Sequence, residues 1–145
     1  MKTEWDYTDL AAAYLKRQDY AQCAIDKMFE VSGVQKGDNA CDVGAGAAHL
    51  TLKLAEYGLH VYAVEPNDAM RANGIKRTSK YADVQWFEGV GEHTGMESNK
   101  FNLVTFGSLW MRGLLLVSIL WKFRRDMFLS WAITGRFLRT AGQVK

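Results

Sequence analysis

A glycine-rich turn directly after a short apolar run constrains this chain more than any other feature of its sequence. Residues 40–43 lead into Gly44-Ala45-Gly46, and a helical pattern begins a few residues later. Glycine lacks the Cβ atom that would keep a ligand away from the backbone, so this turn lets a nucleotide-like molecule approach closely. The sequence therefore predicts a strand, a tight turn and a helix that together form a binding edge.

A second apolar run, residues 60–64, ends in an acidic residue, Glu65, about 20 residues after the glycines. A carboxylate at the carboxyl end of a neighbouring strand can accept hydrogen bonds from the hydroxyl groups of a ribose. The turn and Glu65 together therefore predict a site for a ligand that contains a nucleoside.

Strand-like and helix-like runs alternate up to residue 106. The expected helices are residues 10–16, 20–31, 48–57 and 68–77, and the expected strands are residues 40–43, 60–64, 84–87 and 101–106. This alternation predicts βαβ units and therefore an α/β fold of the Rossmann-like kind. We expect a parallel sheet of about four strands with helices on both faces and the ligand at the carboxyl ends of the strands.

Capping residues mark the ends of two of these helices. Asp19 is expected to cap the second helix, with Gln22 at the reciprocal position of a capping box and Gly33 after the last turn. Asn67 is expected to cap the fourth helix, because Pro66 blocks an earlier start. These positions set the helix bounds independently of the apolar pattern.

An acidic residue two positions before the first glycine separates two families that share such a turn. The dinucleotide fingerprint G-x-G-x-x-G has a third glycine where this chain has His49. The sequence Asp42-Val43-Gly44-Ala45-Gly46 resembles instead the D-x-G-x-G motif of class I S-adenosylmethionine-dependent methyltransferases. A nicotinamide-dependent reductase is the alternative interpretation of the turn.

The resemblance implies a role for each part of this motif. The residues that it places at S-adenosyl-L-methionine are Asp42, Gly44, Ala45, Gly46, Glu65 and Pro66. The glycines let the methionine part pass close to the backbone, and Glu65 holds the ribose. Asp42 either accepts a hydrogen bond from the methionine ammonium, directly or through water, or orients the loop. His49 is expected to open the following helix rather than to act as a base.

Two further segments extend the resemblance. Residues 87–92 resemble the segment that wraps the adenine in the family, with Val90 and Gly91 against the base. Residues 7–20 resemble the helix that many members lay over the cofactor, and Tyr14 and Arg17 are its candidate contacts. A guanidinium can donate two hydrogen bonds to the methionine carboxylate. The alternatives are a solvated arginine at a helix end and a tyrosine that only packs.

The resemblance stops at Ser108, and the composition changes at the same point. Residues 1–107 carry eleven Lys and Arg against fifteen Asp and Glu, a net charge of −4, whereas residues 108–145 carry seven against Asp126 alone, a net of +6. Residues 1–108 are therefore expected to be a truncated S-adenosylmethionine-binding domain. Residues 109–145 are expected to be a basic, apolar tail outside the family.

The tail has three possible origins: an out-of-frame translation or gene remnant, a basic amphipathic segment for a membrane surface, or a divergent helical completion of the fold. Its apolar run, residues 114–121, is far shorter than the ~20 residues of a membrane span. Because the tail lacks a sustained strand alternation, we expect helix or poorly ordered chain. The fourth strand would then keep an open apolar edge and favour self-association.

The whole pattern predicts an S-adenosyl-L-methionine-dependent methyltransferase with a small-molecule acceptor and no nucleic-acid partner. The alternative is a non-catalytic cofactor-binding or interaction fragment, and neither the acceptor nor a catalytic residue can be identified from the sequence. The polar N-terminus has no signal-peptide pattern, which suggests a cytoplasmic location. Cys23 and Cys41 have no metal-ligand spacing and are expected to be reduced thiols.

Overall fold

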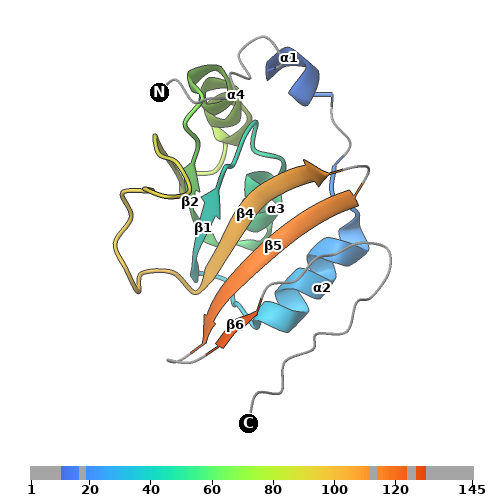
Figure 1. Ribbon diagram of the computed structural model, residues 1–145, viewed down its shortest axis with the longest axis vertical. Helices are drawn as coiled ribbons and strands as arrows, with labels where there is room; N and C mark the ends of the chain where they lie inside the picture. Colours follow the sequence, from blue (N-terminus) through green and yellow to red (C-terminus); the bar gives the residue numbers. More distant parts are fainter. Residues whose placement is uncertain (1–10, 17–18, 112–113, 124–126, 130–145) are drawn as a thin grey trace.

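Six strands form one sheet in the order β3-β2-β1-β4-β5-β6 in the computed structural model of the chain (Figure 1). The strands are β1 Asn39–Val43, β2 His60–Val64, β3 Val84–Phe87, β4 Leu103–Met111, β5 Leu114–Phe123 and β6 Met127–Leu129. The helices are α1 Ala11–Tyr14, α2 Gln22–Ser32, α3 His49–Tyr57 and α4 Asp68–Thr78. The structure describes residues 11–16, 19–111, 114–123 and 127–129.

β1 lies near the centre of the sheet and pairs in parallel with the strands on both sides. Ala40 stands opposite Val61 of β2 and opposite Leu103 of β4. β2 pairs in parallel with β3 as well. The predicted α/β class and the four parallel strands are therefore confirmed, and their carboxyl ends share one edge of the sheet.

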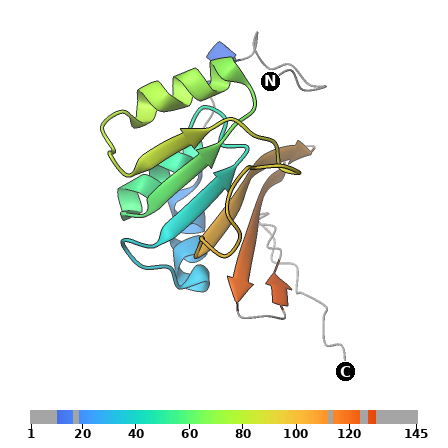
Figure 2. The same cartoon turned by 90° about the vertical axis from the view of Figure 1, so that its left-hand side faces the viewer.

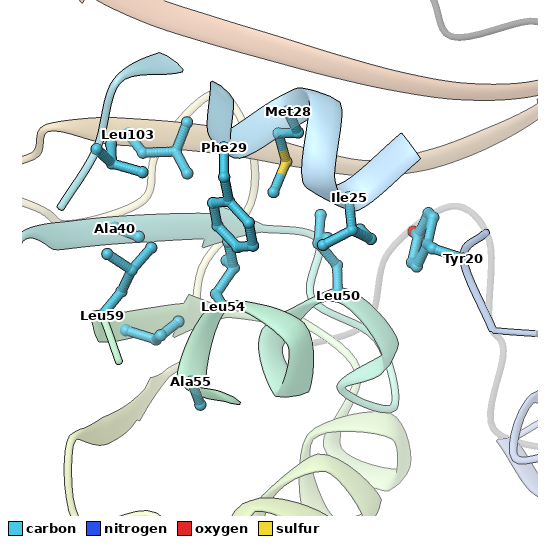
Figure 3. Packing of buried hydrophobic residues seen from close by; sticks show 12 residues of the cluster. Tyr20, Ile25, Met28, Phe29, Ala40, Leu50, Leu54, Ala55, Leu59 and Leu103 are labelled. Carbon is cyan, nitrogen blue, oxygen red and sulfur yellow. The ribbon is translucent and has the colours of Figure 1, made fainter. Parts of the chain in front are cut away.

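The main core lies between the sheet and the helices α2 and α3. Figure 3 shows Met28 and Phe29 of α2 pointing toward Leu54 of α3, and all three side chains are buried. The ring of Phe29 also stacks on Tyr57 with the ring centroids 3.8 Å apart. Burying a leucine or phenylalanine is worth roughly 1.5–3 kcal/mol relative to exposure, so this layer holds β1 and α3 firmly in place.

α4 packs on the same face of the sheet as α2 and α3. Val61 and Ala63 of β2 both face this core side, and Trp86 stands beside Ala63. A Cβ atom at Gly74 of α4 would lie 2.1 Å from the Trp86 ring, so the helix and the strand touch there. In Figure 2 the chain between β3 and β4 crosses the other face. Within the described ranges that connection holds no helix, so the expected helices on both faces are found on one only.

The expected caps are confirmed at the start of α4 and at the end of α2, where Gly33 follows the last turn, but the cap at the start of α2 is corrected. The side chain of Asn67 accepts a hydrogen bond from the backbone N–H of Met70 and caps α4 as predicted. α2 begins after Ala21 with no side-chain cap, so the prediction that Asp19 caps it is wrong. The reason is a competing partner, because the Asp19 carboxylate lies 3.0 Å from His49 Nδ1.

The expectation of helix or disorder after Ser108 is wrong for the part of the tail that the structure describes. β4 continues to Met111, and β5 runs back beside it as an antiparallel strand, with Met111 opposite Leu114. β6 then pairs antiparallel with β5. β-branched and aromatic residues such as Val117 and Trp121 favour this extended form even without polar alternation.

The hairpin partner also changes the edge of the sheet. β4, whose outer edge was expected to be open, is covered by β5 in the structure. Residues 112–113, 124–126 and 130–145 of the predicted tail lie outside the described residues. Among the helices that the structure does describe, none has the length and apolar character that a membrane span requires.

Candidate functional site

The glycine turn follows β1 and is anchored to the end of β2. The backbone N–H groups of Gly44 and Ala45 both donate to the Val64 carbonyl oxygen, at 2.8 and 3.1 Å. Gly44 has a φ of +71° and Gly46 a φ of +56°, which glycine adopts at little cost. The turn therefore stands at the carboxyl ends of β1 and β2, where the sequence placed it.

The carboxylate of Glu65 links this turn to the start of α4. Its Oε2 accepts a 2.8 Å hydrogen bond from the N–H of Gly46, and its Oε1 accepts a 2.9 Å hydrogen bond from the N–H of Asn67. Glu65 is only 7% exposed. Burial raises the pKa of this carboxyl group above its ordinary value, and the two N–H donors pull the pKa back down.

Open space lies against the backbone at Gly46. A Cβ atom built on this residue would meet no heavy atom within 4 Å. The carboxylate of Glu65 borders the same backbone N–H. A ligand can therefore approach the turn where a side chain would otherwise stand, and it would meet an acceptor group there.

The segment after β3 closes around the same edge. A Cβ atom at Gly89 would lie 2.9 Å from Val64 Cγ1, and one at Gly91 would lie 3.9 Å from Val43 Cγ1. The backbone of Val90 exchanges two hydrogen bonds with His93, at 3.3 and 3.0 Å, which folds the segment into a tight turn. Val90 and Gly91 thus lie beside the ends of β1 and β2.

Asp42 lies in the interior, below the turn. Its side chain is fully buried and accepts hydrogen bonds from Thr51 Oγ1 of α3 at 2.7 Å and from Thr105 Oγ1 of β4 at 2.8 Å. Burial raises the pKa of Asp42 to about 6, although both hydroxyl donors favour the charged form. Of the two roles open to Asp42 from the sequence, this geometry favours the orientation of the loop.

The N-terminal candidates are only partly placed. Ala11 of α1 is buried against Ala47 of the turn and Met70 of α4, so α1 lies near the glycine turn as the resemblance implied. Tyr14 ends α1, but its side chain is not among those described. Arg17 lies outside the described residues.

Two arginines of α4 donate hydrogen bonds to backbone carbonyl oxygens around the site, and the sequence analysis missed both. Arg71 Nη1 donates a 2.7 Å hydrogen bond to the carbonyl oxygen of Glu65, and Arg77 Nη1 donates to the carbonyl oxygen of Ala47. Arg71 stands one helical turn after the Asn67 cap, which places it near Glu65 and was the available signal. Nothing in the sequence pattern relates Arg77 to the turn, since the contact joins residues 30 positions apart.

No cluster of three or more His, Cys, Asp or Glu side chains that could hold a metal ion occurs in the described ranges. A groove of about 420 Å³ lies between α2 and α3 and is lined in part by Asp26, Glu30 and Tyr57. None of the predicted site residues lines this groove. The candidate site is therefore the glycine turn with Glu65 and the segment after β3.

The glycine turn, Glu65 and the segment after β3 all lie within the part of the chain that a known family model matches. A sequence profile described as "Methyltransferase domain" matches residues 40–116, more than half of the chain and past Ser108. No sequence among the curated proteins matches this chain.

Several solved structures share the fold. A protein from Anabaena variabilis, described as a methyltransferase of an antibiotic biosynthesis pathway, is 28% identical with a TM-score of 0.50, over 57% of this chain and 32% of that one. An S-adenosylmethionine-dependent methyltransferase from Aquifex aeolicus is 18% identical with a TM-score of 0.52, over 58% and 47%. Phosphoethanolamine N-methyltransferase 2 from Haemonchus contortus, solved with S-adenosyl-L-methionine, is 19% identical with a TM-score of 0.56, over 69% and 25%. The chain thus aligns with a quarter to a half of the length of these relatives.

The buried carboxyl of Asp42 gives a pH-dependent stability that can be measured. Because its pKa is raised in the folded state, its stabilising effect is complete below the unfolded value of 3.8 and is lost as the pH rises through about 6. Asp42→Asn retains an acceptor and adds a donor for the two threonines. We expect the free energy of unfolding of Asp42→Asn, measured relative to that of the parent chain, to increase by up to about 3 kcal/mol from pH 4 to pH 7.

Denaturant titrations at several pH values measure this difference. Asp26→Asn, which changes an exposed carboxylate of α2, is the control and should give no such trend. Parallel pH curves for the parent chain and Asp42→Asn would contradict the assignment of a raised pKa to Asp42.

Proposed function

This chain belongs to the methyltransferase domain family, and from that premise we propose that it binds S-adenosyl-L-methionine at the carboxyl ends of β1 and β2. The observation that carries the proposal is the Glu65 carboxylate at the backbone of Gly46, beside open space. A nucleoside with an amino-acid tail needs a carboxylate for its ribose and a backbone that it can approach closely. The tight turn after β3 can bind its base.

Glu65 can hold the ribose without releasing the turn. A carboxylate offers roughly four acceptor positions, and the N–H groups of Gly46 and Asn67 use two of them. The remaining positions can accept from the ribose hydroxyls. The two backbone contacts therefore aim the carboxylate before the cofactor arrives, which lowers the ordering cost of binding.

In this proposal, the site residues bind different parts of the cofactor. Gly44, Ala45 and Gly46 receive the methionine part, Glu65 and Pro66 the ribose, and Val90 and Gly91 the adenine. Asp42 keeps the turn in position from below through Thr51 and Thr105. Tyr14 and Arg17 stay candidates for the methionine end on the resemblance alone.

We further propose methyl transfer to a small-molecule acceptor. The bound cofactor supplies a methyl group on a positively charged sulfur, and the protein's task is to position the acceptor in line and to exclude water. The likeness to the Haemonchus contortus enzyme, solved with phosphomonomethylethanolamine and S-adenosylhomocysteine, supports the class of acceptor but not its identity. The cytoplasmic location, the lack of a nucleic-acid partner, the truncation after Ser108 and self-association stay predictions.

Gly46→Ala tests the cofactor site directly. The new methyl group would occupy the open space at the turn, so we expect calorimetry to show at least about a tenfold loss of affinity for S-adenosylhomocysteine. The change also places alanine at a φ of +56°, which costs about 1–2 kcal/mol of stability. Gly33→Ala is the matched control, because Gly33 has a φ of +66° with no atom near its Cβ position and ends α2 away from the site. Equal affinity in both variants would contradict the proposed approach of the cofactor at Gly46.

Transfer itself requires a separate measurement. The chain is incubated with S-adenosyl-L-methionine labelled in its methyl group and a panel of small amines, phosphorylated amines, phenols and carboxylates. We expect labelled product from at least one acceptor, and a large loss of turnover in Gly46→Ala but not in Gly33→Ala. Tight cofactor binding with no transfer to any acceptor would contradict the enzymatic proposal and favour a non-catalytic binding protein.

A further inference from the structure

The carboxylate of Asp19 makes a contact that links two parts of the chain 30 residues apart. Its Oδ1 lies 3.0 Å from Nδ1 of His49, the first residue of α3. The His49 side chain is 7% exposed, whereas that of Asp19 is 58% exposed. Asp19 lies just before α2 but does not cap this helix, and its side chain contacts a buried histidine of α3 instead. Its role is therefore in the tertiary structure.

The surroundings of Asp19 favour its charged form. The hydrogen bond to His49 is the largest cause of the lowered pKa of Asp19, and the charges of Lys53 and Arg77 add to it. His49 and Lys53 belong to α3, and Arg77 belongs to α4. The carboxylate therefore lies where two helices of the site present their positive groups.

Two residues of the N-terminal segment, which comprises residues 11–16 and 19, contact the junction between the glycine turn and α3. Ala11 of α1 is buried against Ala47, and Asp19 contacts His49, two residues later in the chain. Arg77, one of the charges near Asp19, also donates to the carbonyl oxygen of Ala47. The contacts of Ala11, Asp19 and Arg77 therefore meet at Ala47 and His49, where the turn leads into α3.

We propose that the Asp19–His49 pair is a positioning contact that holds the N-terminal segment, with α1, against the glycine turn and so raises affinity for the cofactor. The inference rests on the proposed cofactor site. Asp19 does not touch the cofactor in this account. It acts through His49 and through the segment that it keeps in place.

Asp19→Ala tests the inference, because Asp19 is exposed enough to be changed without opening the core. We expect a three- to tenfold weaker affinity for S-adenosylhomocysteine, the range of a charge-assisted hydrogen bond at a partly exposed site. In the ligand-free protein, amide hydrogen exchange of residues 11–16 should become faster, while exchange in β1 and β2 stays unchanged. Asp19→Glu, which keeps the carboxylate, should restore part of the affinity.

A second histidine–carboxylate pair in the same chain provides the control. Asp83 Oδ1 lies 3.1 Å from His60 Nδ1 at the amino end of β2, away from the turn. Asp83→Ala should change neither the affinity nor the exchange of residues 11–16. Unchanged exchange in Asp19→Ala, or faster exchange with unchanged affinity, would overturn the inference. If the parent chain itself bound no S-adenosylhomocysteine, the proposed function would fail and the cofactor part of the inference with it, while exchange alone would still show whether the pair holds the segment.

Discussion

The geometry of the site depends on the hydrogen bonds that the Glu65 carboxylate accepts. This carboxylate accepts one backbone hydrogen bond from the glycine turn and another from the start of α4, and α4 in turn holds the carbonyl oxygen of Glu65 through Arg71. A nearly buried carboxylate costs free energy unless its oxygens are paired. The turn and the helix supply that pairing, so the charge and the two segments that surround it stabilise one another.

A second buried carboxylate, Asp42, supports the same turn from inside the fold. Its hydroxyl partners come from α3 and β4, so three elements meet at one side chain. Glu65 lies close enough that its charge contributes to the raised pKa of Asp42. Two acidic groups near one turn oppose each other electrostatically.

The sequence was sufficient where local rules decide the structure. The glycine turn, the Asn67 cap and the strands β1 to β3 follow from periodicity, from φ requirements and from capping chemistry within a few residues. Long-range contacts were beyond that reasoning. Asp19 has the form of a cap, yet it pairs with a histidine 30 residues away, and Arg77 reaches the turn over a similar separation.

The tail shows a different limit of sequence reasoning. An apolar run without alternation fits a strand or a helix equally well, and the partner strand decides between them. β4 continues past Phe106 with a register shift, and this extension gives β5 an edge on which to pair. The position of that edge depends on the sheet as a whole, so residues 114–123 could not be assigned from their own composition.

A titration of the amide NMR spectrum with S-adenosylhomocysteine tests the proposed cofactor site, because it reports on every backbone N–H of the site at once. We expect the largest shift changes at Gly44, Gly46, Asn67 and Gly91, with little change in the groove between α2 and α3. No change at the glycine turn, or changes concentrated on groove residues such as Phe29 and Tyr57, would contradict a cofactor site at the carboxyl ends of β1 and β2.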